Sequence, residues 1–178
     1  NAGAAVTVTN GADSDNTIAI GNDALASLTS GANNLAIGYQ AADALTTGGS
    51  NIAIGALAMG DVAAEPAGNN NTFIGVSAGG GTWADSDIKE NVGIGNSTLG
   101  GNLVGAQYNT AIGYKAGFDF TSGDRSVLIG AYAGQNITSG ENNICIGANS
   151  GDLITNGGDH VLIGKNAGDV IAAGQVLT

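Results

Sequence analysis

The stretch N-T-A-I-G-Y-K-A-G at residues 109–117 decides the fold, because close copies of it recur along the chain. Its Ile-Gly pair occurs nine times, and successive glycines are separated by 17, 17, 20, 20, 18, 17, 17 and 17 residues. In most copies a small residue follows the glycine by three positions and an apolar residue follows it by seven, ahead of a Thr or Ser and a Gly. Repetition at a fixed short period indicates a stacked-repeat architecture.

A unit of 17 residues is too short for a pair of helices, which takes about 33 residues. It has room for two short β segments separated by glycine turns. Stacking equivalent strands predicts an all-β parallel β-solenoid of about nine coils, each of 17–20 residues and each adding ~4.8 Å to a rod. We expect one repeat domain over residues 1–178, with a half coil at 6–11, nine coils over about 12–174 and the start of a tenth at 171–178.

The strand segments are apolar on both faces, so the sequence alone must be used to decide which face points into the coil and which points outward. Side chains alternate along a strand, and we expect the invariant isoleucine before each glycine to form the interior: Ile20, Ile37, Ile54, Ile74, Ile94, Ile112, Ile129, Ile146 and Ile163. The residues one position earlier are then expected to form an outward apolar stripe: Ala19, Ala36, Ala53, Phe73, Ala111, Leu128, Cys145 and Leu162, with Gly93 in the same row.

An outward stripe of this kind predicts a homo-oligomer, since exposed apolar surface along a whole rod is unfavourable in a monomer. A trimer with the stripes facing a common axis is the arrangement we favour, and a monomer with a mildly apolar flank is the alternative. The ends suggest a further possibility. Incomplete terminal coils could pair one chain with the next and so build a filament, because polar caps normally block such stacking.

Asparagine recurs three positions before the isoleucine, and this regularity predicts an asparagine ladder along the rod. His160 occupies the same position in its unit and is expected to substitute for asparagine in the ladder. No nucleophile is placed beside it by the repeat, so it is not expected to act as a catalytic base. Cys145, the lone cysteine, is expected to be a small core residue, and it excludes an internal disulfide framework.

Composition excludes several functional classes. The formal net charge is −11, and four Lys and Arg residues cannot provide the basic surface that nucleic acid requires. No apolar run approaches the ~20 residues that cross a bilayer, so we expect no membrane insertion. Paired carboxylates, nucleophile–base sets and metal clusters do not emerge from the repeat, and we therefore expect neither enzymatic activity nor a cofactor.

One irregular unit could carry a ligand. It contains Trp83, Asp85, Asp87 and Glu90. An exposed tryptophan could stack on a sugar ring, and the acids could offer oxygen ligands to Ca²⁺; the alternatives are a core position for Trp83 and a solvated acidic loop. Tyrosines at 39, 114 and 132 are expected to be surface packing residues, and a binding row is the alternative.

The copies at residues 51–55 (N-I-A-I-G) and 109–117 also resemble a known family. They are similar to the head repeats of YadA-like trimeric autotransporter adhesins, and more closely to the N-T-A-I-G-Y-x-A-G repeats of phage tail-fibre and bacterial surface-fibre proteins. The resemblance implies an extracellular trimeric fibre, on a cell surface or a virion, that attaches to a surface glycan or receptor. A structural and adhesive fibre segment is therefore the expected function; a filament subunit and, more weakly, a carbohydrate-binding module are the alternatives.

Overall fold

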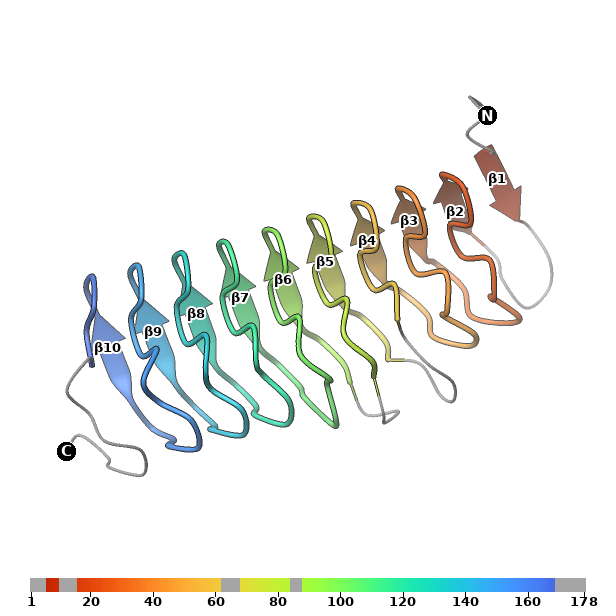
Figure 1. Ribbon diagram of the computed structural model, residues 1–178. Coiled ribbons are helices and arrows are strands. Elements are labelled where there is room, and N and C mark those ends of the chain that lie inside the picture. Colours follow the sequence, from red (N-terminus) through yellow and green to blue (C-terminus); the bar gives the residue numbers. More distant parts are fainter. Residues whose placement is uncertain (1–5, 10–15, 62–67, 84–87, 169–178) are drawn as a thin grey trace.

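The protein is a rod built from a single ten-stranded sheet whose strands follow one another in chain order (Figure 1). The computed structural model describes residues 6–9, 16–61, 68–83 and 88–168. The strands are β1 (Val6–Thr9), β2 (Thr17–Ile20), β3 (Leu35–Ile37), β4 (Ile52–Ile54), β5 (Thr72–Ile74), β6 (Val92–Ile94), β7 (Thr110–Ile112), β8 (Val127–Ile129), β9 (Ile144–Ile146) and β10 (Val161–Ile163). The described residues contain no helix long and apolar enough to cross a membrane.

The parallel solenoid predicted from the repeat is confirmed. Strands β2 to β10 pair parallel with their neighbours, and every isoleucine that precedes a repeat glycine lies opposite the isoleucine of the next coil. Backbone hydrogen bonds also join the coils outside the sheet; the amide of Thr121, for example, donates to the carbonyl of Thr138 at 2.8 Å. The coils are therefore held to each other on more than one side.

The N-terminal segment differs from the expected half coil. β1 runs antiparallel to β2, with Val6 opposite Ile20 and Thr9 opposite Thr17. Of the half coil expected at residues 6–11, residues 6–9 instead form an antiparallel strand that satisfies the edge hydrogen bonds of β2, and residues 10 and 11 lie outside the described residues. The tenth coil expected at 171–178 lies outside the described residues.

The corner after each strand requires glycine. Gly113 has φ +133°, and a Cβ placed on it would lie 2.5 Å from the carbonyl oxygen of Gly130 in the next coil. Backbone therefore packs directly on backbone at this corner, and no side chain fits. Other corners place non-glycine residues in the left-handed region, including Asn33, Asn142 and Asn149; asparagine tolerates that region better than most residues.

The prediction of which strand face points inward is wrong, because the structure has the two faces the other way round. The row predicted to face outward is the interior: Ala36, Phe73, Leu128 and Cys145 are each no more than 1% exposed. The isoleucine row predicted as core lies outside, half-buried or exposed, with Ile94 and Ile112 at 37% and 36%. The reason is the narrowness of the coil, whose opposite wall supplies large side chains such as Leu45, Met59, Leu99, Phe120, Ile137 and Ile154. Small strand residues leave the space that these side chains fill.

In several coils the middle strand residue and the residue six positions later are complementary in size. Ala53 is followed by Met59 and Gly93 by Leu99, whereas Phe73 is followed by Gly79 and Leu128 by Gly134. A Cβ added at Gly79 would lie 2.7 Å from the Phe73 ring, and one added at Gly134 would lie 2.7 Å from the Leu128 side chain. In these coils a large side chain at one position fills the space that a small residue leaves at the other, as close packing requires.

The predicted asparagine ladder is present and buried. The Asn91 amide Nδ2 donates to Asn71 Oδ1 at 3.1 Å, and Asn91 Oδ1 accepts from Asn109 Nδ2 at 3.0 Å and from the Asn109 backbone N–H at 3.1 Å. Ser126 and His160 continue the row, each no more than 1% exposed. His160 accordingly takes a ladder position, its N–H donating to Asn143 Oδ1 at 3.2 Å.

Candidate functional site: an apolar sheet face

The outer face of the parallel sheet is a regular surface that runs across β2 to β10. Two rows of side chains cover it. One row consists of the nine isoleucines that precede the repeat glycines, and the other holds Ile18, Leu35, Ile52, Thr72, Val92, Thr110, Val127, Ile144 and Val161. We call these two rows the isoleucine face. Strand spacing of about 4.8 Å makes it a flat strip roughly 40 Å long.

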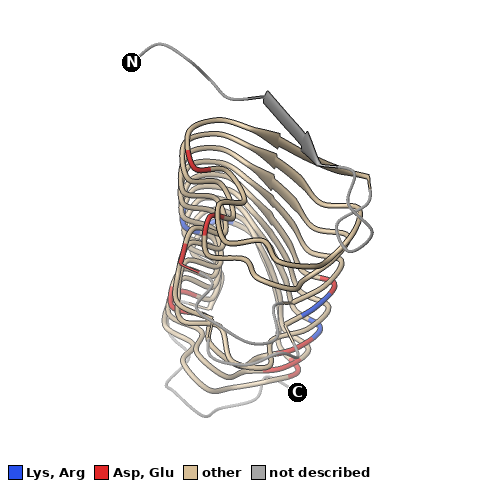
Figure 2. Ribbon diagram, turned by 90° about the vertical axis from the view of Figure 1, so that its right-hand side faces the viewer, with Lys and Arg blue, Asp and Glu red and all other residues tan. Residues whose placement is uncertain are grey.

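The isoleucine face carries no charged side chain, although the chain has fifteen acidic residues. In the end-on view the red and blue segments lie on the turns, and the described parallel strands are tan throughout (Figure 2). Most of its side chains are β-branched and therefore restricted at χ1. The face is consequently flat, rigid and apolar, which are properties of a surface that packs against another protein.

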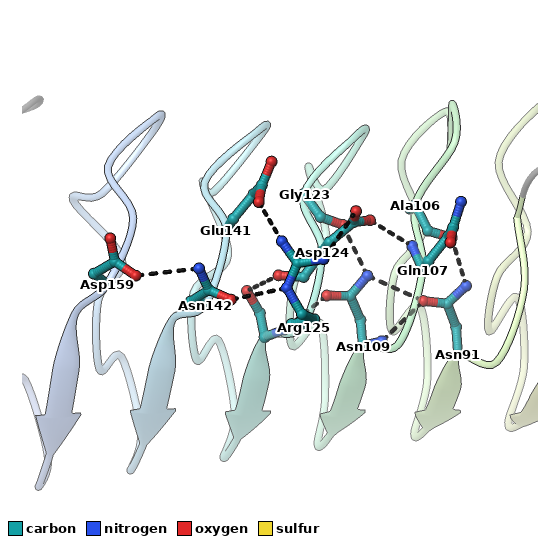
Figure 3. Close-up of polar contacts among 11 residues, drawn as sticks. Asn91, Ala106, Gln107, Asn109, Gly123, Asp124, Arg125, Glu141, Asn142 and Asp159 are labelled. Carbon is teal, nitrogen blue, oxygen red and sulfur yellow. Dashed lines mark hydrogen bonds and ion pairs between the residues drawn. The ribbon is translucent and has the colours of Figure 1, made fainter.

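A row of polar side chains borders the face on the side where the chain enters the strands. Arg125 Nε donates to Asn142 Oδ1 at 3.0 Å, and Asn142 Nδ2 donates to Asp159 Oδ1 at 3.1 Å, so the row is linked along the rod (Figure 3). Arg125 also pairs with Glu141 at 2.5 Å, and Asp124 Oδ1 accepts from the Gln107 backbone N–H at 2.8 Å. These contacts are exposed and contribute little stability. We call the row of Arg125, Asn142 and Asp159, with the equivalent positions in other coils, the polar rim. The hydrogen bonds described here are made within the chain.

The ligand loop predicted around Trp83 does not present its tryptophan. Trp83 is 2% exposed, packs edge-on against Phe73 with ring centroids 5.6 Å apart, and donates from Nε1 to the Gly79 carbonyl at 3.1 Å. The core alternative for Trp83 is therefore correct, and sugar stacking on this ring is wrong. Glu90 is exposed in the polar rim, whereas Asp85 and Asp87 lie outside the described residues. The described part of the chain contains no group of three or more His, Cys, Asp or Glu residues placed to hold a metal ion.

Cys145 lies in the strand interior, as a small core residue should. Burial raises the pKa of its thiol to about 12, although a hydrogen bond with Ser150 lowers it in part. Asp43 is a second perturbed group: desolvation, together with the charges of Asp61 and Asp23, raises the pKa of its carboxyl. Its Oδ1 is buried without a hydrogen-bond partner.

The sequence expectation missed a cluster of aromatic and cationic side chains on the turn after β7 and β8. Tyr114 and Tyr132 meet edge to face with ring centroids 5.2 Å apart, and Lys115 Nζ lies 4.6 Å from the centroid of Phe118. The signal was present in the sequence, since Tyr114 and Tyr132 sit one and two positions after their repeat glycines in adjacent units. Adjacent positions in successive coils become neighbours in space.

Comparison with known proteins gives this chain no relatives. Neither the scan against protein-family models nor the searches of curated proteins and solved structures return a match.

Proposed function

We propose that this protein is a non-enzymatic, extracellular fibre segment that assembles as a homo-oligomer through its isoleucine face and serves in attachment to a surface. The observation that carries the proposal is the isoleucine face itself, a rod-length apolar strip on the outside of a single chain. A face of this kind is stabilised when a second apolar surface covers it. A second copy offers a matching surface with the same 4.8 Å periodicity.

A trimer is the arrangement we favour. Three flat strips placed around one axis let each strip contact two others, so every row is covered along the full length of the rod. The repeats also resemble those of trimeric fibre proteins, as the motif at residues 109–117 indicates. The polar rim, whose hydrogen bonds are already made within the chain, would lie at the edge of such an interface, where protein interfaces are typically polar.

Light scattering tests the proposal, because a trimer has three times the chain mass of 17.2 kDa. The informative variant is Ile54→Glu with Ile112→Glu, which places two charges on the isoleucine face. The matched control is Val104→Glu, since Val104 is 41% exposed and lies outside the strands that form the isoleucine face. We expect trimers for the parent and the control, and a β-rich monomer for the double variant.

A parent protein of monomeric mass at micromolar concentration would overturn the assembly. If the double variant does not fold, cross-linking decides: Ile112→Cys should give covalent oligomers with a short bismaleimide, and Val104→Cys should not. Binding of fluorescent protein to cells or particles then tests the attachment role separately.

A second candidate is a filament subunit that assembles end to end. Among the described strands none pairs with the outer edge of β10, where Val161 and Ile163 are 61% and 67% exposed. His160 Nδ1, which is bonded to Cγ as Oδ1 is in asparagine, is buried without a partner. In the preceding coils that position accepts the next backbone N–H. Electron microscopy separates the two candidates, as rods of one length against filaments of unlimited length.

A further inference from the structure

The turn after β7 and β8 carries an exposed aromatic cluster, formed by Tyr114, Lys115, Phe118 and Tyr132, which we call the aromatic corner. Tyr114 is 44% exposed and the other three are half-buried. The four residues follow the repeat glycines after β7 and β8, and none of them belongs to the two rows of the isoleucine face.

The backbone holds the aromatic corner in place. The Tyr132 N–H donates to the Tyr114 carbonyl at 2.8 Å, and the Lys115 N–H donates to the Asn96 carbonyl at 3.0 Å. Phe118 packs over Gly100, where an added Cβ would lie 3.0 Å from the ring. The rings therefore need little reorganisation on binding, which lowers the entropic cost of capturing a ligand.

The chemistry of the corner defines what it can bind. Lys115 Nζ lies 5.7 Å from the Tyr114 centroid and 4.6 Å from the Phe118 centroid, so a cation of the chain itself already occupies the position that a cationic ligand would need. Backbone hydrogen bonds bring three residues with uncharged amide side chains to these turns: the Asn96 carbonyl accepts from the Lys115 N–H, the Gln135 N–H donates to the Tyr132 carbonyl, and the Asn149 N–H donates to the Ala131 carbonyl. A fitting ligand therefore combines an apolar face, for the rings, with several neutral hydroxyl groups, for the amides.

We propose that the aromatic corner binds a neutral saccharide, with the C–H face of a pyranose ring against the tyrosines and its hydroxyl groups on the surrounding amides. The electron-rich ring faces attract the weakly positive C–H groups, and the tyrosine hydroxyls supply further hydrogen bonds. This inference rests on the attachment role proposed above and gives that role a ligand class.

The test is binding of the full chain to a printed array of neutral and acidic glycans, followed by titration of a bound neutral glycan. Tyr132→Ala and Tyr114→Ala are expected to weaken binding about tenfold or more. Tyr39→Ala is the matched control, because Tyr39 holds the same turn position as Tyr114 and is 53% exposed. Among the described residues Tyr39 has no aromatic or cationic partner, and its removal should leave affinity unchanged. Tyr132→Phe keeps the ring and should retain most of the binding.

Three results would overturn the saccharide site: no neutral glycan bound by the parent, binding weakened equally by Tyr39→Ala, or binding confined to acidic glycans and abolished by Lys115→Gln. Circular dichroism of each variant shows whether the coil is intact. The mass of the particle reports separately on the fibre. A trimer that binds no glycan would contradict only the saccharide site at the aromatic corner. A monomer that binds glycan through the corner would contradict only the proposed assembly.

Discussion

The ring of Phe73 fills the space above Gly93, the next residue in the interior row. A Cβ built on Gly93 would lie 2.6 Å from Cδ1 of that ring and 3.0 Å from the Thr98 hydroxyl. Phe73 itself is fully buried in a row where four of the other eight residues are alanine. The smallest residue of the row therefore stands beside the largest because the two share one volume.

Gly93→Ala should destabilise the fold by about 2 kcal/mol, since the added methyl group overpacks the interior. Phe73→Ala should cost about 3–5 kcal/mol through the cavity that it leaves. The double variant should be more stable than the sum of the two losses predicts, because the new methyl group then occupies vacated space. Denaturant unfolding of all four proteins gives the coupling energy; strictly additive losses would contradict the shared volume.

The ladder makes a second prediction. Asn91→Ala should cost about 3 kcal/mol, because it leaves the buried amide groups of Asn109 without their acceptor and removes the Asn91 donor to the Ala106 carbonyl. Asn91→Ser should cost less, since Ser126 fills a ladder position and its Oγ accepts from the Asn143 N–H at 3.2 Å. Asn96→Ala, at an exposed site, should change stability by no more than about 0.5 kcal/mol. Equal losses of stability in Asn91→Ala and Asn96→Ala would mean that the asparagine ladder contributes nothing to the free energy of unfolding.

The raised pKa of the Asp43 carboxyl leads us to expect that replacing this residue stabilises the protein. Its folded-state pKa is raised above the ordinary 3.8, mainly by desolvation and then by the charges of Asp61 and Asp23. A raised carboxyl pKa favours folding at low pH, and that contribution is lost as the pH rises through the folded-state value. Asp43→Asn should therefore stabilise the protein at pH 7 by about a few tenths of a kcal/mol, allowing for solvent screening. The gain should fade as the pH drops through the ordinary 3.8 and be nearly absent at pH 3, where Asp43 is mostly neutral in both states.

Thermal unfolding of parent and Asp43→Asn at pH 7 and pH 3 measures this effect. Asp124→Asn is the control, because the Asp124 carboxylate accepts a hydrogen bond from the Gln107 N–H. That substitution should be neutral or destabilising at pH 7. A loss of stability in Asp43→Asn would contradict the prediction.

Cys145 should resist alkylation. The thiolate is the nucleophile, and burial raises the pKa of this thiol from 9.0 to about 12. Iodoacetamide at pH 8.5 should therefore modify Cys145 only as fast as the coil opens, and denaturant should accelerate the reaction sharply. Ser139→Cys, at an exposed turn, should react immediately in the same protein. Mass spectrometry follows the alkylation of each thiol. Equal alkylation rates for Cys145 and for the cysteine at position 139 in the folded protein would show that the interior is open to solvent.

The linear pattern of the sequence predicted the coil, the register and the ladder, because stacking places equivalent residues side by side. It did not predict which strand face is inside. Both faces read as apolar, and alternation alone does not distinguish them. One clue to the inner face is the size relation, seen in several coils, between the middle strand residue and the residue six positions later, as in Phe73 with Gly79 and Gly93 with Leu99. Only residues that share an enclosed space need to compensate each other's volume.

Two other features escaped for different reasons. The segment at residues 6–9 resembles part of a repeat, but edge pairing allowed it to run antiparallel. Trp83 was open to two interpretations because its unit is irregular, and only the contacts with Phe73 and the Gly79 carbonyl decide between them. The aromatic corner depends on side-chain contacts between neighbouring coils. The repeat predicts which coils are neighbours but not which of their side chains touch.

The column of glycines that ends each strand has a consequence for how such a rod changes length. At Gly113 the backbone of one coil touches the backbone of the next, so single substitutions there disturb two rungs at once. Gain or loss of a complete 17-residue unit recreates the same contact one step along. Duplication is thus an easier route of divergence than point mutation at this column, and the reach of the molecule is expected to vary between homologues in whole steps of about 4.8 Å.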